Sequence, residues 1–360
     1  MSVSEQLTQQ EIDAAIAALL GRLDSIDAAC AGCFPLYARD GRWEVSTGGS
    51  WMGGFWAGLW WLRARLGGAP SDQTKAAELC SRLQTKVSSD SLNRSLIFWH
   101  GAALGDLWHG DERARGLAER AAAELAGSFN ARMGCIALGC EMGGGREGRR
   151  RISIDPLAST LALLHHSRQT WVREIAEQHA CTTLAACGTA DGAYAGGAVY
   201  DQGLFSREGQ AGNWSRGQAW AMLGLSRAAH CYGEPYLSAA LHACRYWQHS
   251  RGVLLPLNQL DRPDGVCDPS AGVMSALAML QLAALTPVNQ SLLEQANRQL
   301  AVVVRSRYFS VADDPGRQCA AGAFTGNCYR TREGRDELVE SSCGTFFLLV
   351  SLLALIGRGG

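Results

Sequence analysis

The sequence predicts an all-α protein built as an (α/α)6 barrel, with six inner helices surrounded by six outer helices. Three observations lead to this prediction. Apolar periodicity indicates twelve helices and no convincing long strand. These helices alternate along the chain between amphipathic segments and segments that are apolar nearly all round. The connections alternate as well, because those leading from an outer to an inner helix are mostly long.

Amphipathic helices with one charged face are expected on the outside of the barrel, and apolar helices inside it. Glu112–Arg115 shows the charged type, whereas Met52–Trp61 and Ala271–Ala284 show the apolar type. The expected outer helices are 7–27, 72–88, 112–127, 170–186, 235–249 and 290–305, and the expected inner helices are 51–66, 96–108, 156–167, 214–230, 269–284 and 343–356.

The long connections all fall on one rim of the predicted barrel, at the N-terminal ends of the inner helices. Long loops on a rigid scaffold usually carry function. The positive ends of the inner-helix dipoles also point at this rim, which favours an anionic substrate. We expect a single domain over residues 1–360, with long loops at 28–50, 128–155, 187–213, 250–268 and 306–342.

The composition fits a globular enzyme better than a nucleic-acid or membrane protein. Hydrophobic residues make up 47% of the chain, charged residues make up 19%, and the net charge is −1, so no basic excess points to nucleic acid. Met1–Gln10 is polar and shows no signal peptide, and the apolar run Phe346–Ile356 is too short to span a membrane. We therefore expect a cytoplasmic protein.

No cofactor and no metal are expected. Cys30 and Cys33, two of the thirteen cysteines, have metal or redox spacing, but no second pair follows them. Their role stays open. Nothing in the sequence resembles a Ser/His/Asp triad, a P-loop or a metal cluster.

Tryptophans near two helix starts are candidate sugar platforms. Trp214, Arg216 and Trp220 stand close together at the start of 214–230. Indoles can cover the C–H faces of a sugar ring while polar groups bind its hydroxyls. Trp51 and Trp56 are similar candidates. The alternative is that these tryptophans belong to the core.

Candidate acids and polar groups occur at other inner-helix starts. Asp155 precedes a proline, which is typical of a helix N-cap, but a desolvated carboxyl group there could also hold a proton for catalysis. For Asp268 capping is favoured. His100 is either a pH-active group or a core histidine. Ser341 and Ser342 either hold an anion or cap a helix.

In their order and placement, these motifs resemble glycoside hydrolase family 88, the unsaturated glucuronyl hydrolases, over about residues 48–357. The resemblance implies an (α/α)6 barrel that acts on a 4,5-unsaturated uronic acid at the non-reducing end of an oligosaccharide. It also implies that an aspartate protonates C4 while water adds at C5. The matching segments are Trp51–Gly58, Ile154–Ala158, Trp214–Trp220, Asp268–Ala271 and Cys343–Leu348.

The resemblance implies that Asp155 is the general acid and that Gln210 assists near the water. The family's second aspartate, aligned on Gly101, falls on Trp99, and a histidine and an indole of the family are missing from 192–200 and 135–141. A sugar- or cyclitol-tailoring enzyme and a non-catalytic carbohydrate binder therefore remain alternatives. The expected ligand is a small sugar or oligosaccharide, anionic in character. The expected binding residues are Trp51, Trp56, Trp99, His100, Gln210, Trp214, Arg216, Trp220, Ser341 and Ser342.

Overall fold

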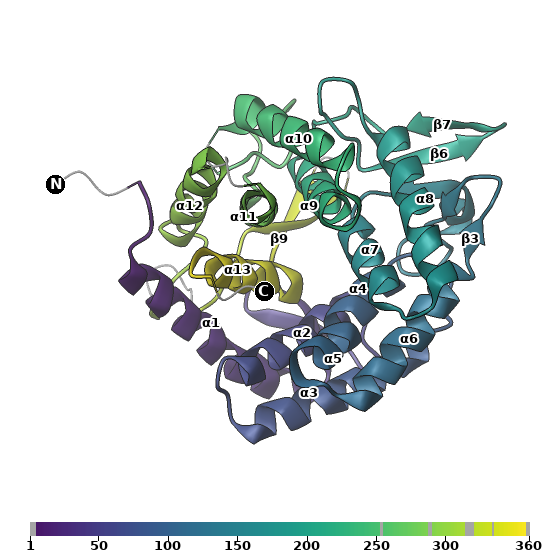
Figure 1. Cartoon of the computed structure of the whole chain (residues 1–360). Coiled ribbons are helices and arrows are strands. Elements are labelled where there is room, and N and C mark those ends of the chain that lie inside the picture. The colour runs from purple at the N-terminus through teal and green to yellow at the C-terminus, as the bar shows by residue number, and fades with distance from the viewer. Residues whose placement is uncertain (1–4, 253–254, 287–289, 314–319, 333–334, 358–360) are drawn as a thin grey trace.

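The computed structural model describes residues 5–252, 255–286, 290–313, 320–332 and 335–357, and these are mostly helical (Figure 1). The prediction of a helical protein is confirmed, and each predicted helix has a counterpart. A π-helical turn at Trp99–Ala103 interrupts one of them. The helices are α1 Gln9–Cys30, α2 Trp51–Arg65, α3 Pro70–Arg82, α4 Arg94–Phe98, α5 Leu104–His109, α6 Glu112–Ala126, α7 Leu157–His166, α8 Thr170–Cys187, α9 Ser215–Tyr232, α10 Tyr236–Arg251, α11 Pro269–Leu285, α12 Gln290–Val304 and α13 Ser342–Leu355.

The helices form an inner and an outer layer (Figure 1). In the inner layer, α2, α4 with its π-helical turn, α7, α9, α11 and α13 each contact the next, and α13 contacts α2, so that the ring closes. Inner helices are buried all round, as Met52–Leu62 of α2 shows. The outer helix α12 buries residues such as Leu292 and Ala296 on one side only. The alternation of amphipathic and apolar segments reflects this arrangement.

Short antiparallel strands lie in the long loops, which corrects the prediction of a protein without a sheet. They have two to seven residues, and four of the six strand pairings among the described residues are local hairpins. Such short runs contain too few residues for an alternating pattern to be recognised in the sequence. The sheets are β2–β1–β9–β8 (β1 Phe34–Arg39, β2 Arg42–Ser46, β8 Asn327–Arg332, β9 Arg335–Ser341), β3–β4 (Phe129–Asn130, Cys135–Ile136) and β5–β6–β7 (Arg151–Ser153, Gly197–Asp201, Leu204–Arg207).

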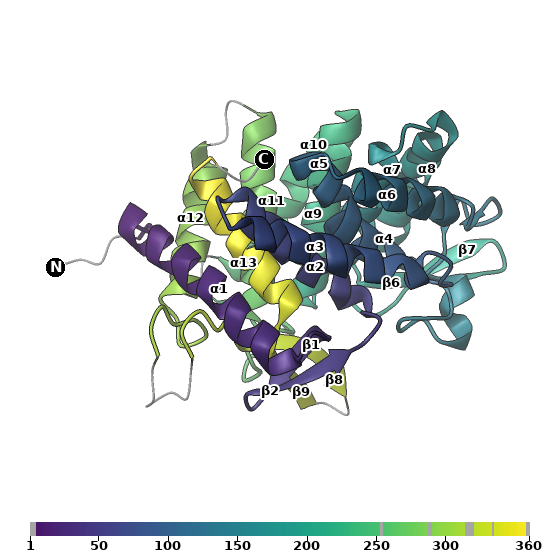
Figure 2. The same cartoon turned by 90° about the horizontal axis from the view of Figure 1, so that it is seen from below.

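The sheets join loops that are distant in the sequence. Tyr37 of β1 pairs with Ser341 of β9, which connects the loops 28–50 and 306–342. Figure 2 shows this sheet at one end of the helices, away from the C-terminal end of α13. In the third sheet, β5 pairs with β6 and connects two further loops. The pairing therefore organises the rim at the N-terminal ends of the inner helices.

A glycine allows α2 and α4 to approach closely. A Cβ atom on Gly54 would lie 2.5 Å from the Cα of Ile97 and 2.6 Å from the carbonyl oxygen of Leu96. No other residue fits there without moving a backbone segment. This contact holds the beginnings of α2 and α4 side by side at the rim.

Candidate active site

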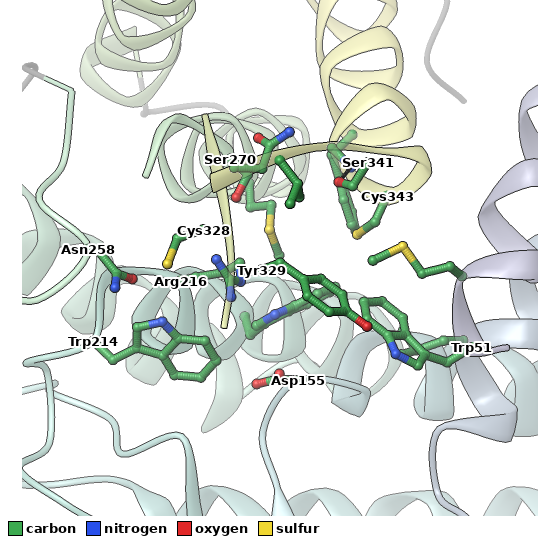
Figure 3. A pocket seen from close by; sticks show the side chains of 18 of the residues that line it. Trp51, Asp155, Trp214, Arg216, Asn258, Ser270, Cys328, Tyr329, Ser341 and Cys343 are labelled. Carbon is green, nitrogen blue, oxygen red and sulfur yellow. Dashed lines mark hydrogen bonds between the residues drawn. The ribbon is translucent and has the colours of Figure 1, made fainter. Parts of the chain in front are cut away.

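A cavity of about 360 Å³ lies at the N-terminal ends of the inner helices (Figure 3). Each inner helix contributes a residue in its first turn or just before it. The positive ends of the helix dipoles therefore point toward one space. The contributed residues are Trp51, Asn93, Asp155, Trp214, Ser270 and Ser341.

The cavity brings together some of the predicted site residues and leaves others out. Those in its wall are Trp51, Asp155, Trp214, Arg216, Trp220 and Ser341. Gln210 lines a neighbouring cavity that shares Asp155 with the first. The side chains outside both cavities are those of Trp56, Trp99, His100 and Ser342.

The Asp155 carboxyl group has no partner in the described chain. Its Oδ1 atom is inaccessible to solvent and makes no hydrogen bond. The side chain does not cap α7, so the capping alternative is not realised. Burial raises the pKa of Asp155 to about 7, although the Arg216 guanidinium opposes this increase. A carboxyl group with such a pKa can donate a proton at neutral pH.

Arg216 is fixed in the cavity wall by Asp268. Its Nη1 atom donates to Asp268 Oδ2, and its Cζ atom lies 5.1 Å from the centroid of the Trp214 ring. Burial is the largest single influence on the pKa of Arg216 and lowers it, but the charges of Asp268, Asp155 and two nearby cysteines together outweigh burial and raise the pKa overall. Asp268 also accepts a hydrogen bond from Ser270 Oγ and makes no capping bond to α11, which corrects the capping role expected for it. The ion pair therefore adds little net charge to the cavity.

The Trp214 indole lies against two glycines. A Cβ atom on Gly217 would be 2.4 Å from Trp214 Cε3, and one on Gly196 would be 3.0 Å from the same atom. The ring could not occupy this position if either residue carried a side chain. Gln218, from the same motif, is buried and makes hydrogen bonds of 2.9 and 2.8 Å to the backbone of the loop 187–213. The motif thus places an indole and anchors a rim loop.

The second cavity has a volume of about 350 Å³ and adjoins the first at Asp155. Asp155, Trp214 and Gln259 line both cavities. Most of the remaining wall comes from β5, from β6 and from the loop 187–213. The other wall residues are Leu138, Arg151, Ile152, Ser153, Gly196, Gly197, Glu208, Gly209, Gln210 and Asn213.

The arginines that precede Asp155 are all paired with carboxylates. The charges of these arginines are therefore largely compensated. The pairs are Arg149 with Asp90 at 3.1 Å, Arg150 with Glu147, and Arg151 with Glu208 at 2.8 Å.

His100 is a core histidine, which corrects its expected place in the binding site. Its Nδ1 atom lies 2.8 Å from the Leu96 carbonyl oxygen. Its ring centroid lies 4.2 Å from that of Phe55 and 4.8 Å from that of Phe346. Burial lowers the pKa of His100 to about 3, so the ring is neutral at physiological pH.

Trp99 lines neither cavity, which corrects its expected place among the binding residues. It begins the π-helical turn after α4, and the Arg227 guanidinium lies 5.5 Å from its ring centroid. The residue that precedes α4 and lines the cavity is Asn93. The Asn93 amide donates to the Met142 carbonyl oxygen at 3.0 Å. The alignment on Gly101 did not point to Asn93, because the start of α4, and not Gly101, faces the cavity.

Trp56 also lies outside the cavity. It is fully buried, and its ring lies 5.9 Å from that of Trp60 in an edge-to-face contact. A helix turns by about 100° per residue, so Trp56 lies about 140° around α2 from Trp51. The position of Trp56 corrects the expectation of a platform there, whereas Trp51 faces the cavity.

The two serines before α13 have different positions. Ser341 lines the cavity and caps α13, because its Oγ atom accepts a hydrogen bond from the Gly344 N–H at 3.0 Å. Ser342 is buried, and its hydroxyl donates to the Pro35 carbonyl oxygen at 2.8 Å. Ser342 therefore ties α13 to β1 and does not face a ligand.

Several wall residues carry no sequence signal. The sheet of the first and last loops places Tyr329 of β8 in the wall, where its ring lies 4.4 Å from that of Tyr37. Asn93 and Ser270 could have been found, because both stand at the start of a predicted inner helix. The other unpredicted polar or sulfur-bearing wall residues are Met52, Asn258, Gln259, Met274, Asn327, Cys328 and Cys343.

Within the described residues, no group of three or more His, Cys, Asp or Glu side chains could hold a metal ion. Cys30 and Cys33 accordingly have no further such ligand beside them in this part of the chain. Nor do the described residues include a helix that is both long enough and apolar enough to cross a bilayer.

Solved structures similar to this chain are unsaturated glucuronyl hydrolases. The enzyme from Bacillus sp. GL1, responsible for the degradation of glycosaminoglycan, has a TM-score of 0.86 and 23% identity, over 97% of this chain and 98% of that one. The enzyme from Streptococcus agalactiae has a TM-score of 0.84 and 17% identity, over 99% and 94%.

A further similar structure is a UGL in which an aspartate is replaced by asparagine, with dGlcA-Glc-Rha-Glc. It has a TM-score of 0.85 and 23% identity, over 97% of this chain and 98% of that one. No protein-family model and no curated protein matches the sequence. The chain therefore has the fold of the unsaturated glucuronyl hydrolases, and the resemblance seen in its motifs is confirmed at the level of the fold.

Proposed function

We propose that this chain is an enzyme of the unsaturated glucuronyl hydrolase type, a single-domain (α/α)6 barrel. Its reaction is the acid-catalysed hydration of the enol ether in an unsaturated or modified uronic-acid sugar. The observation that carries this proposal is the unpaired carboxyl group of Asp155, whose Oδ1 atom is inaccessible to solvent and whose pKa is raised to about 7 in a cavity with indole walls. The shared fold and the oligosaccharide in a similar protein support the substrate class.

In the proposed reaction, Asp155 acts first as an acid and then as a base. The protonated carboxyl group transfers its proton to C4 of the C4=C5 double bond, and positive charge develops at C5 and the ring oxygen. The ionised carboxylate then takes a proton from the water molecule whose oxygen bonds to C5. The hemiketal at C5 opens to a ketone, which leaves a hemiacetal at C1 that releases the neighbouring sugar as an alcohol. One water molecule is consumed and Asp155 recovers its proton.

The other wall residues bind and orient the sugar in this proposal. Trp51 and Trp214 offer apolar faces to the ring, and Trp220 closes the floor with its own ring 5.3 Å from that of Phe347. The positive ends of the inner-helix dipoles favour a substrate carboxylate. Gln210 lines the adjoining cavity, which meets the first cavity at Asp155.

One observation favours a second candidate function. Asn93 supplies an amide to the cavity wall at the start of α4, and no carboxylate of α4 lines that wall. Among the described wall residues of the first cavity, Asp155 is therefore the acid without an ion-pair partner. A sugar- or cyclitol-tailoring enzyme that isomerises, dehydrates or hydrolyses a small metabolite with one acid fits this arrangement. A carbohydrate binder has no need for the unpaired acid.

Loss of ultraviolet absorbance from the conjugated enol ether tests the proposal directly. With unsaturated disaccharides, absorbance should decay with the wild type and not with Asp155→Asn, and calorimetry should show that both forms bind the sugar. Asp201→Asn, an exposed carboxylate at the end of β6, should leave the decay unchanged. Equal decay in wild type and Asp155→Asn would contradict the role of Asp155. Binding without decay in the wild type would favour the tailoring enzyme.

A further inference from the structure

The second cavity meets the first at the Asp155 carboxyl group. The two cavities have nearly equal volumes, about 350 and 360 Å³, and share Asp155, Trp214 and Gln259. A sugar ring in the first cavity with its reacting carbon at Asp155 therefore has a second open space beside it. A disaccharide could extend from the first space into the second.

The floor of the second cavity is bare backbone. A Cβ atom on Gly197 would lie 2.5 Å from the Ile152 carbonyl oxygen and 3.1 Å from Glu208 Oε2. The residue cannot carry a side chain, because β6 is paired with β5 at this position. Gly197 therefore allows β5 and β6 to approach closely beside the second cavity.

The only ion pair in the described wall of this cavity is Arg151 with Glu208. Nε and Nη2 of Arg151 donate to Glu208 Oε2 at 3.0 and 2.8 Å. The two side chains are 35% and 33% exposed, so both face the cavity mouth. Within the described chain, Arg151 Nη1 and Glu208 Oε1 make no hydrogen bond. The pair thus presents one donor and one acceptor and has no net charge.

Apart from Asp155, the remaining polar side chains of the wall are uncharged. Ser153, Gln210, Asn213 and Gln259 offer a hydroxyl and three amides. These groups can exchange hydrogen bonds with sugar hydroxyls. An anionic group would instead be repelled by the Glu208 carboxylate, and the charge of Arg151 is already compensated by Glu208. The free energy lost by removing the anionic group from water would therefore not be recovered in this cavity.

We propose that the second cavity binds an uncharged, hydroxyl-rich group, the departing sugar of a disaccharide, and that the Arg151–Glu208 pair selects against anionic sugars there. The inference rests on the proposed function, because it takes Asp155 as the group at the reacting carbon. The pair acts on substrate selection and takes no part in proton transfer.

Replacing Glu208 by glutamine tests the selection, because Glu208→Gln leaves the charge of Arg151 uncompensated. We expect the wild type to prefer unsaturated disaccharides with a neutral departing sugar over those with a sulfated one. In Glu208→Gln, the KM for the sulfated sugar should fall by about tenfold, with kcat changed little, because a freed guanidinium can bind the sulfate. The matched control is Glu147→Gln, which releases Arg150 from a similar pair outside both cavities. This control should leave the preference unchanged.

The reciprocal variant separates selection from loss of structure. Arg151→Gln leaves the Glu208 carboxylate uncompensated, so discrimination against the sulfated sugar should increase. A structural defect would instead raise the KM for both substrates in both variants. Equal use of neutral and sulfated sugars by the wild type, or shifts of the same sign in the two variants, would overturn the inference.

Binding to the Asp155→Asn variant distinguishes failure of this inference from failure of the proposed function. Calorimetry with neutral and sulfated unsaturated disaccharides should show tighter binding of the neutral sugar. Binding of both sugars with equal affinity would overturn the selection by Arg151 and Glu208 but leave the reaction at Asp155 standing. Binding of neither sugar would contradict both proposals.

Discussion

At Asp155, burial and charge act in opposite directions. Burial raises its pKa to about 7, and the nearby guanidinium of Arg216 works against this increase. The pairing of Arg216 with Asp268 weakens the opposing effect, because the two charges largely cancel. The acidity of Asp155 therefore depends on side chains from two other inner-helix starts, Arg216 and Asp268.

The pH dependence of the reaction should reveal this carboxyl group. If protonated Asp155 is the acid, kcat/KM should be constant below about pH 7 and should fall above it, approaching a tenfold decrease per pH unit. Steady-state rates on an unsaturated disaccharide between pH 5 and 9 would measure this. A kcat/KM that rises through pH 7 would mean that the ionised form starts the reaction.

The same pKa predicts how Asp155 affects stability. The carboxyl group titrates near its ordinary value of 3.8 in the unfolded chain but near 7 in the folded one. Its contribution to stability is therefore fully present below about pH 4 and is lost as the pH rises toward 7, because the unfolded chain releases the proton first. In Asp155→Asn this loss is absent. The melting temperature of the variant relative to wild type should increase between pH 4 and 7 and then level off, and a constant difference would contradict the raised pKa.

At the scale of elements, the helices were predictable and the strands were not. Pro269–Leu285 was expected at 269–284 because a long apolar run has few alternatives. An inner helix that is apolar all round does not reveal which side faces the cavity, so Trp56 and Trp51 could not be told apart. Asp155 was found through its proline neighbour. That the Asp155 side chain does not cap α7, by contrast, depends on where β5 places the chain. The position of Tyr329 in the cavity wall depends on the sheet that joins two distant loops.

Replacing Gly217 in α9 by alanine should disturb the Trp214 platform selectively. The added Cβ would meet the indole at 2.4 Å, whereas alanine favours the helix itself. We expect KM to rise about tenfold with little loss of melting temperature, because the ring must move away from the sugar. Gly116→Ala on α6, where the nearest atom is 4.0 Å away, is the control and should stabilise the protein without changing KM. Similar KM values in the two variants would contradict the role of Trp214.

At the scale of the whole molecule, the inner ring depends on close helix contacts. Each inner helix packs against two neighbours, so displacement of one helix changes the cavity that all of them line. The contact between α2 and α4 at Gly54 is the tightest point of this kind, since the Cβ of any other residue would meet backbone atoms. A substitution at Gly54 should therefore lower the stability of the protein and distort the cavity at the same time.

Gly54→Ala tests this coupling. We expect a loss of about 1–3 kcal/mol in the free energy of unfolding, because the added methyl group overpacks two backbone segments. Activity should fall in parallel with the melting temperature, unlike in Gly217→Ala. Denaturant unfolding and the absorbance assay on the same preparation would measure both. A variant with wild-type stability would show that α4 can move away from α2 without lowering the free energy of unfolding.

The bond between Ser342 and Pro35 joins residues 307 positions apart along the chain. The same region supplies Ser341, Cys343 and Phe347 to the cavity and packs α13 against α2. During synthesis, the inner helices made first must therefore wait with an exposed apolar side until the last one emerges from the ribosome. Contacts of this range slow folding and leave apolar surface open to aggregation in the meantime. We expect this protein to acquire its ligand site in the final step of folding and to be a client of chaperones that shield nascent chains.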